Sequence, residues 1–301
     1  MADIIGIGAS VFDTLMLAEN FPQEDTKLKA MSSKIQGGGP CATALVAAAQ
    51  LGVSAEYFGL LGDDVYGRYM LDEFRRYGVE CDSVRIVKNA ASFNSFVLIN
   101  KSNSSRTCVW NPGTLPSMGE ADVPLDKLKA AKYLHLDGNH VDAAVFAAKK
   151  ASEYQVKVSL DAGSPYPGIE KLLPLADILI PSEEFVSNIT GKESPEEGAE
   201  WIYLKYKPEI FIITQGANGG FIFDGTDVIR YEPFSAEVVD TNGAGDTFHG
   251  AFLAARVRRM GLREAVNFAS AAAAIKCRGF GARESIPSYD ETMKAIKEAK
   301  A

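Results

Sequence analysis

The 301-residue sequence has few of the residues that build metal centres or disulfide frameworks. It contains three histidines and four scattered cysteines, none of which forms a C-x-x-C pair: Cys41, Cys81, Cys108 and Cys277. No histidine stands at the spacing of a zinc ligand beside them. This scatter indicates reduced, structural thiols in a cytoplasmic protein.

Patterns typical of several other functional classes are also missing. The net charge is −8 and there is no basic run, which argues against a nucleic-acid partner. No apolar stretch is long enough to span a membrane, and the N-terminus has no basic segment followed by an apolar one. We therefore expect neither a membrane partner nor a signal peptide. The motif G-x-x-x-x-G-K-[ST] does not occur, which argues against a P-loop enzyme.

The composition is that of an ordinary globular protein, with 47% hydrophobic and 23% charged residues. Short β-rich runs alternate with alanine-rich helical stretches. We predict strands at 4–9, 56–61, 133–137, 156–161, 178–181 and 210–214, a hairpin of 220–224 with 228–231 that turns near Asp224-Gly225, and helices at 40–51, 66–77 and beyond 247. This order implies an α/β fold with a mainly parallel central sheet flanked by helices. Ligands of such folds bind at the carboxyl ends of the strands.

Residues 12–36 and 84–112 do not fit this alternation. The first segment lacks a helical pattern, and the second alternates polar and apolar side chains. We interpret both as strands of a small separate β-sheet, inserted as a lid. No linker, repeat or low-complexity tract divides the chain, so residues 1–301 are predicted to form one domain with this lid.

The run Val-Val-Asp-Thr-Asn-Gly-Ala-Gly-Asp-Thr-Phe-His-Gly-Ala-Phe at 238–252 is the most informative segment. A turn with two glycines leads into Asp246 and then into a helical stretch. This order puts a carboxylate at the positive end of a helix, beside backbone N–H groups that can bind an anion. Such a site is suited to moving a phosphoryl group onto a hydroxyl. A capped structural turn is the alternative, and His249, on the same helix face as Asp246, is expected to be structural.

Three other glycine-rich segments are candidates for ligand contact. Gly37-Gly38-Gly39 precedes a helix and permits close approach to the main chain. The segment 214–219 follows a buried strand and is either a nucleotide contact or a hairpin turn. The pair Gly6-x-Gly8 lacks the third glycine of a dinucleotide fingerprint, because Val11 takes its place. A nicotinamide-dependent oxidoreductase is therefore the minority interpretation.

Together these segments resemble the ribokinase-like (PfkB-type) carbohydrate kinases over nearly the whole chain. Gly-Gly-Gly-Pro-Cys-Ala-Thr-Ala at 37–44 is similar to the first signature of the family, and 240–248 to the second. Gly62-Asp63-Asp64-x-x-Gly67 is similar to a further family element. The resemblance implies a large α/β domain with a β-sheet lid. It also implies transfer of the γ-phosphoryl group of ATP to a sugar hydroxyl.

The resemblance also implies roles for individual residues. Asp246 is the base, and the backbone N–H groups of Gly243, Ala244 and Gly245 form an anion hole. Sugar contacts fall on Asp13, Gly38, Gly39 and Thr43, and ATP contacts on Thr214, Gly216, Gly219, Gly243 and Gly245. Thr43 stands where many relatives carry asparagine. The turn of Asp240 and Asn242 resembles a monovalent-cation site, which suggests K⁺.

One family element is altered. The Asn-x-x-Glu motif that orders magnesium and phosphate falls at 182–185, where Ser182 takes the asparagine position and Phe185 the glutamate position. We expect Glu183 to compensate through water. Mg²⁺ is still required, because the charge of a transferring phosphoryl group calls for a cation.

The lid segments resemble those of ketohexokinases and sulfofructose kinases at 22–27 and 103–107. There Asp25 is expected to bind sugar hydroxyls, Arg106 to face the substrate, and Lys27 either to bind an anionic group or to lie exposed. We favour a neutral ketose such as fructose, because Trp110 and Gly138 stand where sulfofructose kinases place other sulfonate-binding residues. An anionic sugar (sulfofructose or a phosphosugar), a nucleoside, and a non-catalytic sugar- or nucleotide-binding regulator remain alternatives. The exposed edges and apolar face of the lid predict a homodimer.

Overall fold

A nine-stranded sheet forms the centre of the molecule in the computed structural model, which describes residues 1–103, 105–192, 194–223 and 227–299. Its strand order is β15-β14-β13-β12-β11-β10-β1-β4-β6. The strands are β1 Ile4–Ile7, β4 Ala55–Phe58, β6 Val79–Glu80, β10 Tyr133–Leu136, β11 Lys157–Ala162, β12 Ile178–Pro181, β13 Ile210–Thr214, β14 Gly220–Phe223 and β15 Val228–Tyr231. All neighbours from β13 to β6 are parallel, and β14 and β15 are antiparallel. The predicted hairpin turn at Asp224-Gly225 lies outside the described residues.

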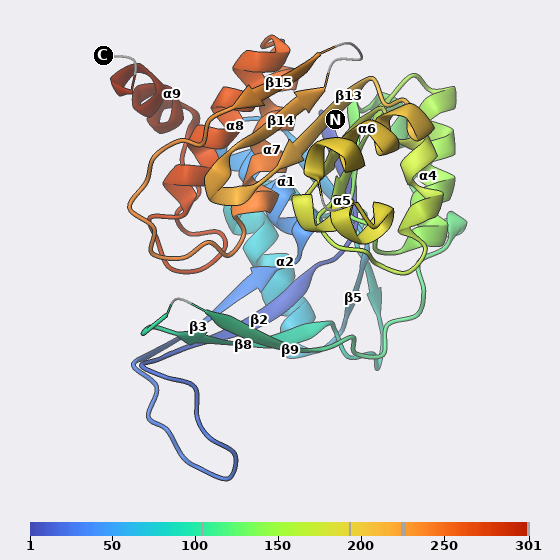
Figure 1. Ribbon diagram of the computed structural model, residues 1–301. Coiled ribbons are helices and arrows are strands. Elements are labelled where there is room, and N and C mark those ends of the chain that lie inside the picture. The colour runs from blue at the N-terminus through green and yellow to red at the C-terminus, as the bar shows by residue number, and fades with distance from the viewer. Residues whose placement is uncertain (104, 193, 224–226, 300–301) are drawn as a thin grey trace.

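Helices cover both faces of this sheet, as predicted (Figure 1). One layer contains α1 Pro40–Gln50, α2 Val65–Tyr77, α7 Ala244–Val257, α8 Leu262–Lys276 and α9 Tyr289–Glu298; the other contains α3 Leu125–Ala130, α4 Val141–Glu153, α5 Glu183–Thr190 and α6 Pro195–Tyr206. Successive side chains of each strand point to opposite layers: Ile178 and Ile180 join the first core and Leu179 the second. Burial on both faces explains why these strands are uninterrupted apolar runs.

The lid is a separate four-stranded sheet with the order β3-β2-β8-β9. Its strands are β2 Val11–Ala18, β3 Ser32–Gly38, β8 Asn94–Asn100 and β9 Arg106–Asn111. Figure 1 shows it beside the main body, below the sheet in this view. Residues 12–36 and most of 84–112 therefore supply a lid sheet, as predicted.

The predicted lid segment 84–112 is too long at its start. β7, Arg85–Val87, pairs in parallel with β5, Leu60–Gly62, in a small sheet of its own. The predicted strand 56–61 is accordingly two strands, β4 in the central sheet and β5 in this small one. Alternation of side chains in sequence shows that a segment is extended, but it does not show which sheet the segment joins.

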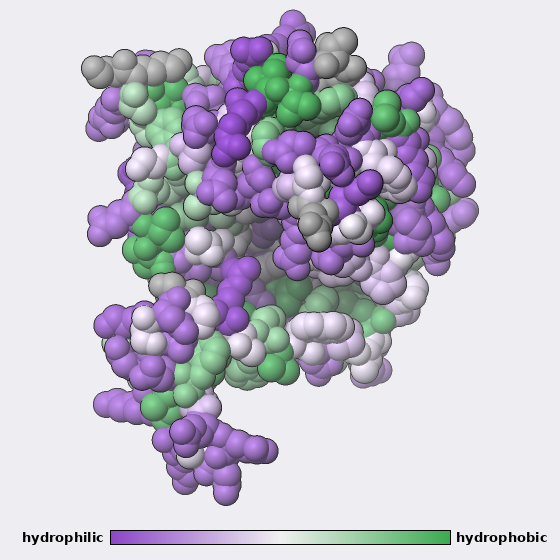
Figure 2. All heavy atoms as spheres, in the orientation of Figure 1, coloured by the Kyte–Doolittle hydropathy of each residue, from purple (hydrophilic) through white to green (hydrophobic). Residues whose placement is uncertain are grey.

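The connection between β2 and β3, residues 19–31, extends away from the rest of the molecule (Figure 1). Its side chains are mostly exposed, and its far end is hydrophilic (Figure 2). In the described ranges, no helix is long and apolar enough to cross a membrane.

Candidate active site

Asp246 lies in the first turn of α7, and Gly243 caps that helix with φ 77°. A side chain at Gly243 would be strained by this backbone conformation and would approach Ala282 within 2.8 Å. The amides of Gly243 and Gly245 donate to no acceptor among the described residues, whereas the amide of Ala244 donates to the Thr241 carbonyl (3.1 Å). The predicted anion hole therefore differs at Ala244, whose N–H already closes the turn.

Asp246 as a whole residue is partly exposed. Desolvation by the surrounding protein, reinforced by the negative charge of Asp161, nevertheless raises the pKa of Asp246 to about 7. His249 acts in the opposite direction. A base with a pKa near neutrality is well matched to removing a proton from a hydroxyl.

His249 faces the protein interior and not the open site. Its Nε2 lies 3.3 Å from Oδ1 of Asp161, and both side chains are buried. Burial favours a higher pKa for Asp161, but His249 and the N–H of Gly163 (2.8 Å) hold that pKa below its usual range. The ring of His135 lies tilted against that of His249, with centroids 5.6 Å apart, and desolvation lowers the pKa of His135 to about 3. His249 thus contacts the buried Asp161, whose negative charge acts on Asp246.

The other buried acid at the carboxyl end of a central strand is Asp137, which the sequence did not single out. Its Oδ2 accepts the amides of Ala9 (2.8 Å) and Cys41 (3.0 Å), and its Oδ1 accepts the amide of Asn139 (3.0 Å). It thereby fixes the first strand against the start of α1. A polar residue that ends a buried apolar run, as both Asp137 and Asp161 do, is the sequence signal that could have found them.

The glycines before α1 fit tightly around lid residues. A Cβ on Gly38 would lie 1.9 Å from Oδ2 of Asp13, and Gly39 has φ 92° and approaches the Ala9 carbonyl. Asp13 is buried, accepts a hydrogen bond from the Ser95 hydroxyl (2.6 Å), and has a pKa that burial raises. The structure therefore brings Asp13, Gly38 and Gly39 together, as expected for a common binding site.

Thr43 is fully buried behind this segment, and its hydroxyl accepts a hydrogen bond from Nε of Arg283 (3.2 Å). The Arg283 guanidinium also donates to the Gly38 carbonyl (2.9 Å) and pairs with the buried carboxylate of Glu73. Glu73 in turn accepts the Gly37 amide (2.8 Å). The Thr43 hydroxyl therefore accepts from the same guanidinium that holds the Gly38 carbonyl, and its contact with the sugar stays a prediction.

The lid contacts the turn 240–243 before α7, which is predicted to bind an anion and is called the anion-binding turn below, through Arg106 on β9. Its Nη1 lies 3.5 Å from Oδ1 of Asn242. Register pairs Leu17 with Ile99 and Ile99 with Arg106, which puts Arg106 on the same lid face as Asp13. The prediction that Arg106 faces the site is consistent with this contact.

Thr214 ends β13, and Gly216 and Gly219 follow it at the same edge of the central sheet. A Cβ on Gly219 would meet the Tyr231 carbonyl, so the hairpin itself requires this glycine. By contrast, none of the described atoms lies within 4 Å of a Cβ placed on Gly216. The surface at Gly216 is open to a ligand, and ATP contact by these residues stays a prediction.

The altered element at 182–185 begins α5. Ser182 caps that helix by accepting the Phe185 amide (3.0 Å), and the Phe185 side chain lies in the apolar core. Neither side chain is available to a metal. Glu183 is partly exposed in the first turn, and a carboxylate is the kind of ligand that Mg²⁺ prefers. Glu183 therefore fits the water-mediated role predicted for it.

The structure does not bring Asp25 and Lys27 to the other predicted site residues. Both are exposed in the protruding loop 19–31 (Figure 1). The resemblance suggested sugar contact for Asp25 and left Lys27 open between an anionic group and an exposed position, and it did not show the path of the loop within one chain.

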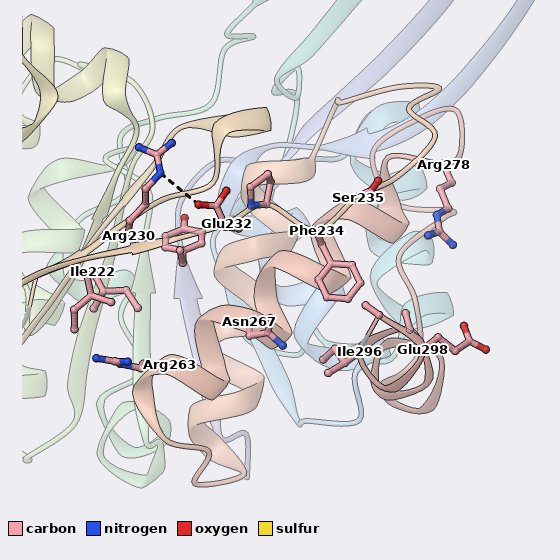
Figure 3. Close-up of a pocket in the computed structure, with 15 residues that line it drawn as sticks. Ile222, Arg230, Glu232, Phe234, Ser235, Arg263, Asn267, Arg278, Ile296 and Glu298 are labelled. Atoms are coloured by element: carbon pink, nitrogen blue, oxygen red, sulfur yellow. Dashed lines mark ion pairs between the residues drawn. The ribbon is translucent and has the colours of Figure 1, made fainter. Parts of the chain in front are cut away.

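An open cavity of about 640 Å³ lies elsewhere, between β15, the segment after it and helices α8 and α9 (Figure 3). Its rim includes the ion pair of Arg230 and Glu232 (3.6 Å). None of the predicted catalytic or sugar-binding residues lines this cavity. The arrangement around Asp246, and not the size of a cavity, identifies the candidate site.

A family model described as pfkB family carbohydrate kinase matches residues 1–289. The chain belongs to the pfkB family of carbohydrate kinases. It is 28% identical over 301 residues to a ribokinase of Haemophilus influenzae, covering 97% of this chain and 98% of that protein. It is 24% identical over 285 residues to the ketohexokinase of Mus musculus, covering 91% and 95%. The structure of Arabidopsis thaliana ribokinase complexed with ribose and ATP matches with a TM-score of 0.86 at 27% identity, over 98% of this chain and 99% of that chain.

Family membership makes the protein an ATP-dependent carbohydrate kinase. It confirms the fold predicted from the sequence, and it sets aside an oxidoreductase or a non-catalytic regulator. The identity to the ketohexokinase does not exceed that to the ribokinase. Local motifs in the lid therefore do not by themselves select the substrate of this kinase.

Proposed function

We propose that this kinase phosphorylates a primary hydroxyl of a neutral ketose such as fructose, with Asp246 as the base. The observation that carries the proposal is the position of Asp246, with a pKa of about 7, beside the amides of Gly243 and Gly245, which donate to no acceptor in the described part of the chain. A proton acceptor and phosphate-binding donors at one helix terminus are the parts that phosphoryl transfer to a hydroxyl requires.

In the proposed mechanism, Asp13 and the glycine segment orient the sugar under the lid. Asp246 accepts the hydroxyl proton while the Gly243 and Gly245 amides and the α7 dipole stabilise negative charge on the phosphoryl oxygens. Glu183 would hold Mg²⁺ through water, and the ion would supply positive charge that offsets the negative charge of the phosphates. Closure of the lid excludes water, which would otherwise compete as the acceptor.

A neutral acceptor is favoured because the cations considered for an anionic group are already paired or lie in the exposed loop. Arg283, whose charge acts on Asp13, is fully buried and paired with Glu73. Lys27, the residue that the sequence offered for an anionic group, lies in the exposed loop. Neither residue therefore offers a free cation to a sulfonate or phosphate, and Arg106 is the cation on the Asp13 face of the lid that the substrate panel has to test.

A coupled assay of ATP consumption tests this proposal with ketoses, aldoses, sulfosugars, phosphosugars and nucleosides as acceptors. We expect the highest kcat/KM with a neutral ketose, and a raised KM for that sugar in Asp13→Asn because a hydroxyl loses a charged acceptor. A higher kcat/KM with a nucleoside or a phosphosugar would overturn the choice of substrate. An absence of phosphorylation in the whole panel would count against the proposed function itself.

We further propose a homodimer formed through the lid. Cross-strand register places Ile35, Thr14, Phe96 and Val109 in one row on the lid face opposite Asp13. Phe96 is 54% and Val109 69% exposed, and an apolar sheet face of this kind favours a second copy of the chain. In such a dimer, the protruding loop with Asp25 and Lys27 could contact the surface of the second copy.

Sedimentation velocity tests the dimer. We expect the wild-type chain to sediment as a dimer and Val109→Asp as a monomer, because the substitution places a charge in the apolar contact. Val228→Asp is the matched control, since Val228 is exposed on β15 of the central sheet. A monomeric wild type, or a monomer produced equally by both variants, would contradict the proposed contact.

A further inference from the structure

Lys276 is the last residue of α8, and its side chain is fully buried (0% exposed). Lysine is almost never fully buried, because its ammonium group loses its hydration. The Nζ atom donates to the main-chain carbonyl oxygen of Asp240 (2.9 Å). Among the residues that the structure describes, this ammonium forms no ion pair with a carboxylate. A carbonyl oxygen, and not an acidic side chain, therefore holds the buried charge.

The Asp240 carboxylate is already occupied by main-chain donors. Its Oδ1 accepts the amide of Asn242 (2.9 Å) and its Oδ2 the amide of Gly281 (2.9 Å). The Asp240 amide donates to the Cys277 carbonyl (3.1 Å). These bonds tie the start of the anion-binding turn to the segment after α8. The main-chain carbonyl of Asp240 accepts its hydrogen bond from the buried Lys276 ammonium.

The carboxylates near Lys276 favour the charged form of its side chain. Burial lowers the pKa of Lys276, while the negative charges of Asp240 and Asp246 act in the opposite direction. Asp246 is thus near enough to interact with the Lys276 ammonium. It lies three residues after Gly243, the residue that caps α7. A positive charge under the turn stabilises the peptide that leads to the Gly243 and Gly245 amides, and it adds to the positive potential at their phosphate-binding side.

We propose that the Lys276 ammonium takes the place of a monovalent cation beneath the phosphate-binding turn, so that this kinase needs no added K⁺. The turn of Asp240 and Asn242 is where the sequence suggested such a cation. The residues present do not fit a second cation at the same carbonyl oxygen, because two like charges would repel at close range. Lys276 is in this view a positioning residue for the proposed kinase reaction.

The test compares wild type with Lys276→Ala in chlorides of potassium, ammonium and choline at equal ionic strength. Wild type is expected to have the same kcat, KM for ATP and melting temperature in all three salts. Lys276→Ala should lose about tenfold in kcat/KM for ATP in choline, and should recover activity and melting temperature in potassium or ammonium, which can enter the space left by the side chain. Lys34→Ala is the matched control, because Lys34 donates to the Phe280 carbonyl in the same segment (3.0 Å); it should gain no response to potassium.

Two results would overturn the proposal: a wild type that potassium activates, or a Lys276→Ala variant that keeps full activity in choline and gains no thermal stability from either cation. If Lys276→Ala does not fold in any salt, Lys276→Gln decides, because it keeps a donor for Asp240 without the charge. Wild-type activity in Lys276→Gln would then count against the proposal. Melting temperatures do not depend on the acceptor sugar, so they test the cation even if no sugar in the panel is phosphorylated.

Discussion

Asp246→Asn should lower kcat by between about a hundredfold and ten-thousandfold, the range typical for loss of a positioned general base. Asparagine has nearly the same size and preserves the first turn of α7, so ATP affinity should remain nearly unchanged. Initial rates from the coupled assay and ATP titration by calorimetry measure the two quantities separately. Asp142→Asn is a matched control, because Asp142 is an exposed acid in the first turn of α4. Near-wild-type turnover in Asp246→Asn would remove Asp246 from the mechanism.

The same residue predicts the pH dependence of the reaction. The base must be unprotonated, so kcat/KM for the sugar should fall about tenfold per pH unit below a pH of about 7. Asp161 contributes negative charge that raises the pKa of Asp246. In Asp161→Asn this contribution is lost, and the acidic limb of the profile should move to lower pH. A limb that does not move would show that Asp246 is not the group that titrates.

The second large effect is expected on stability. Arg283→Met leaves the buried carboxylate of Glu73 without its cation, and breaking one half of a buried pair costs about 3–5 kcal/mol. It also removes donors from the Gly38 carbonyl and the Thr43 hydroxyl. We therefore expect the free energy of unfolding, measured by urea denaturation, to fall by about this amount.

Two further variants separate the buried charge from a general effect of losing arginine. Adding Glu73→Gln to Arg283→Met should recover part of the lost stability, because the uncompensated charge is gone while an acceptor for the Gly37 amide remains. Arg75→Met, which breaks an exposed pair with Asp72, should change stability by at most about 0.5 kcal/mol. A double variant less stable than Arg283→Met alone would show that the pair is not the source of the loss.

The central sheet and the glycine turn before α7 were predictable because their signals are local. Buried strands are continuous apolar runs, and the glycines around 243–245 stand next to the acid that they serve. The roles of Lys276 and Arg283 were not predicted from the sequence. Each acts through a main-chain carbonyl or a partner far along the chain, as Arg283 does with Glu73, and a single lysine or arginine in a helical or loop region has no pattern of its own.

The assignment of Thr43 shows a second limit. Its position in the first signature was predictable, but whether its hydroxyl meets a ligand or another side chain depends on packing across 240 residues of sequence. The exposed position of Asp25 and Lys27 has the same cause. A motif gives the identity of a residue, whereas the direction of a loop is decided by the surfaces beside it.

The glycine segment and lid strand β3 are held by the end of the chain. The Gln36 side chain accepts the Ala282 amide (2.9 Å), and Lys34 donates to the Phe280 carbonyl (3.0 Å). The ribosome adds Lys34 and Gln36 to the chain 246 residues before their partners Phe280 and Ala282. A nascent chain that already contains Asp246 therefore still has an unfastened sugar site. The glycine segment and β3 can therefore be fixed in place only after residues 280–282 have been synthesised.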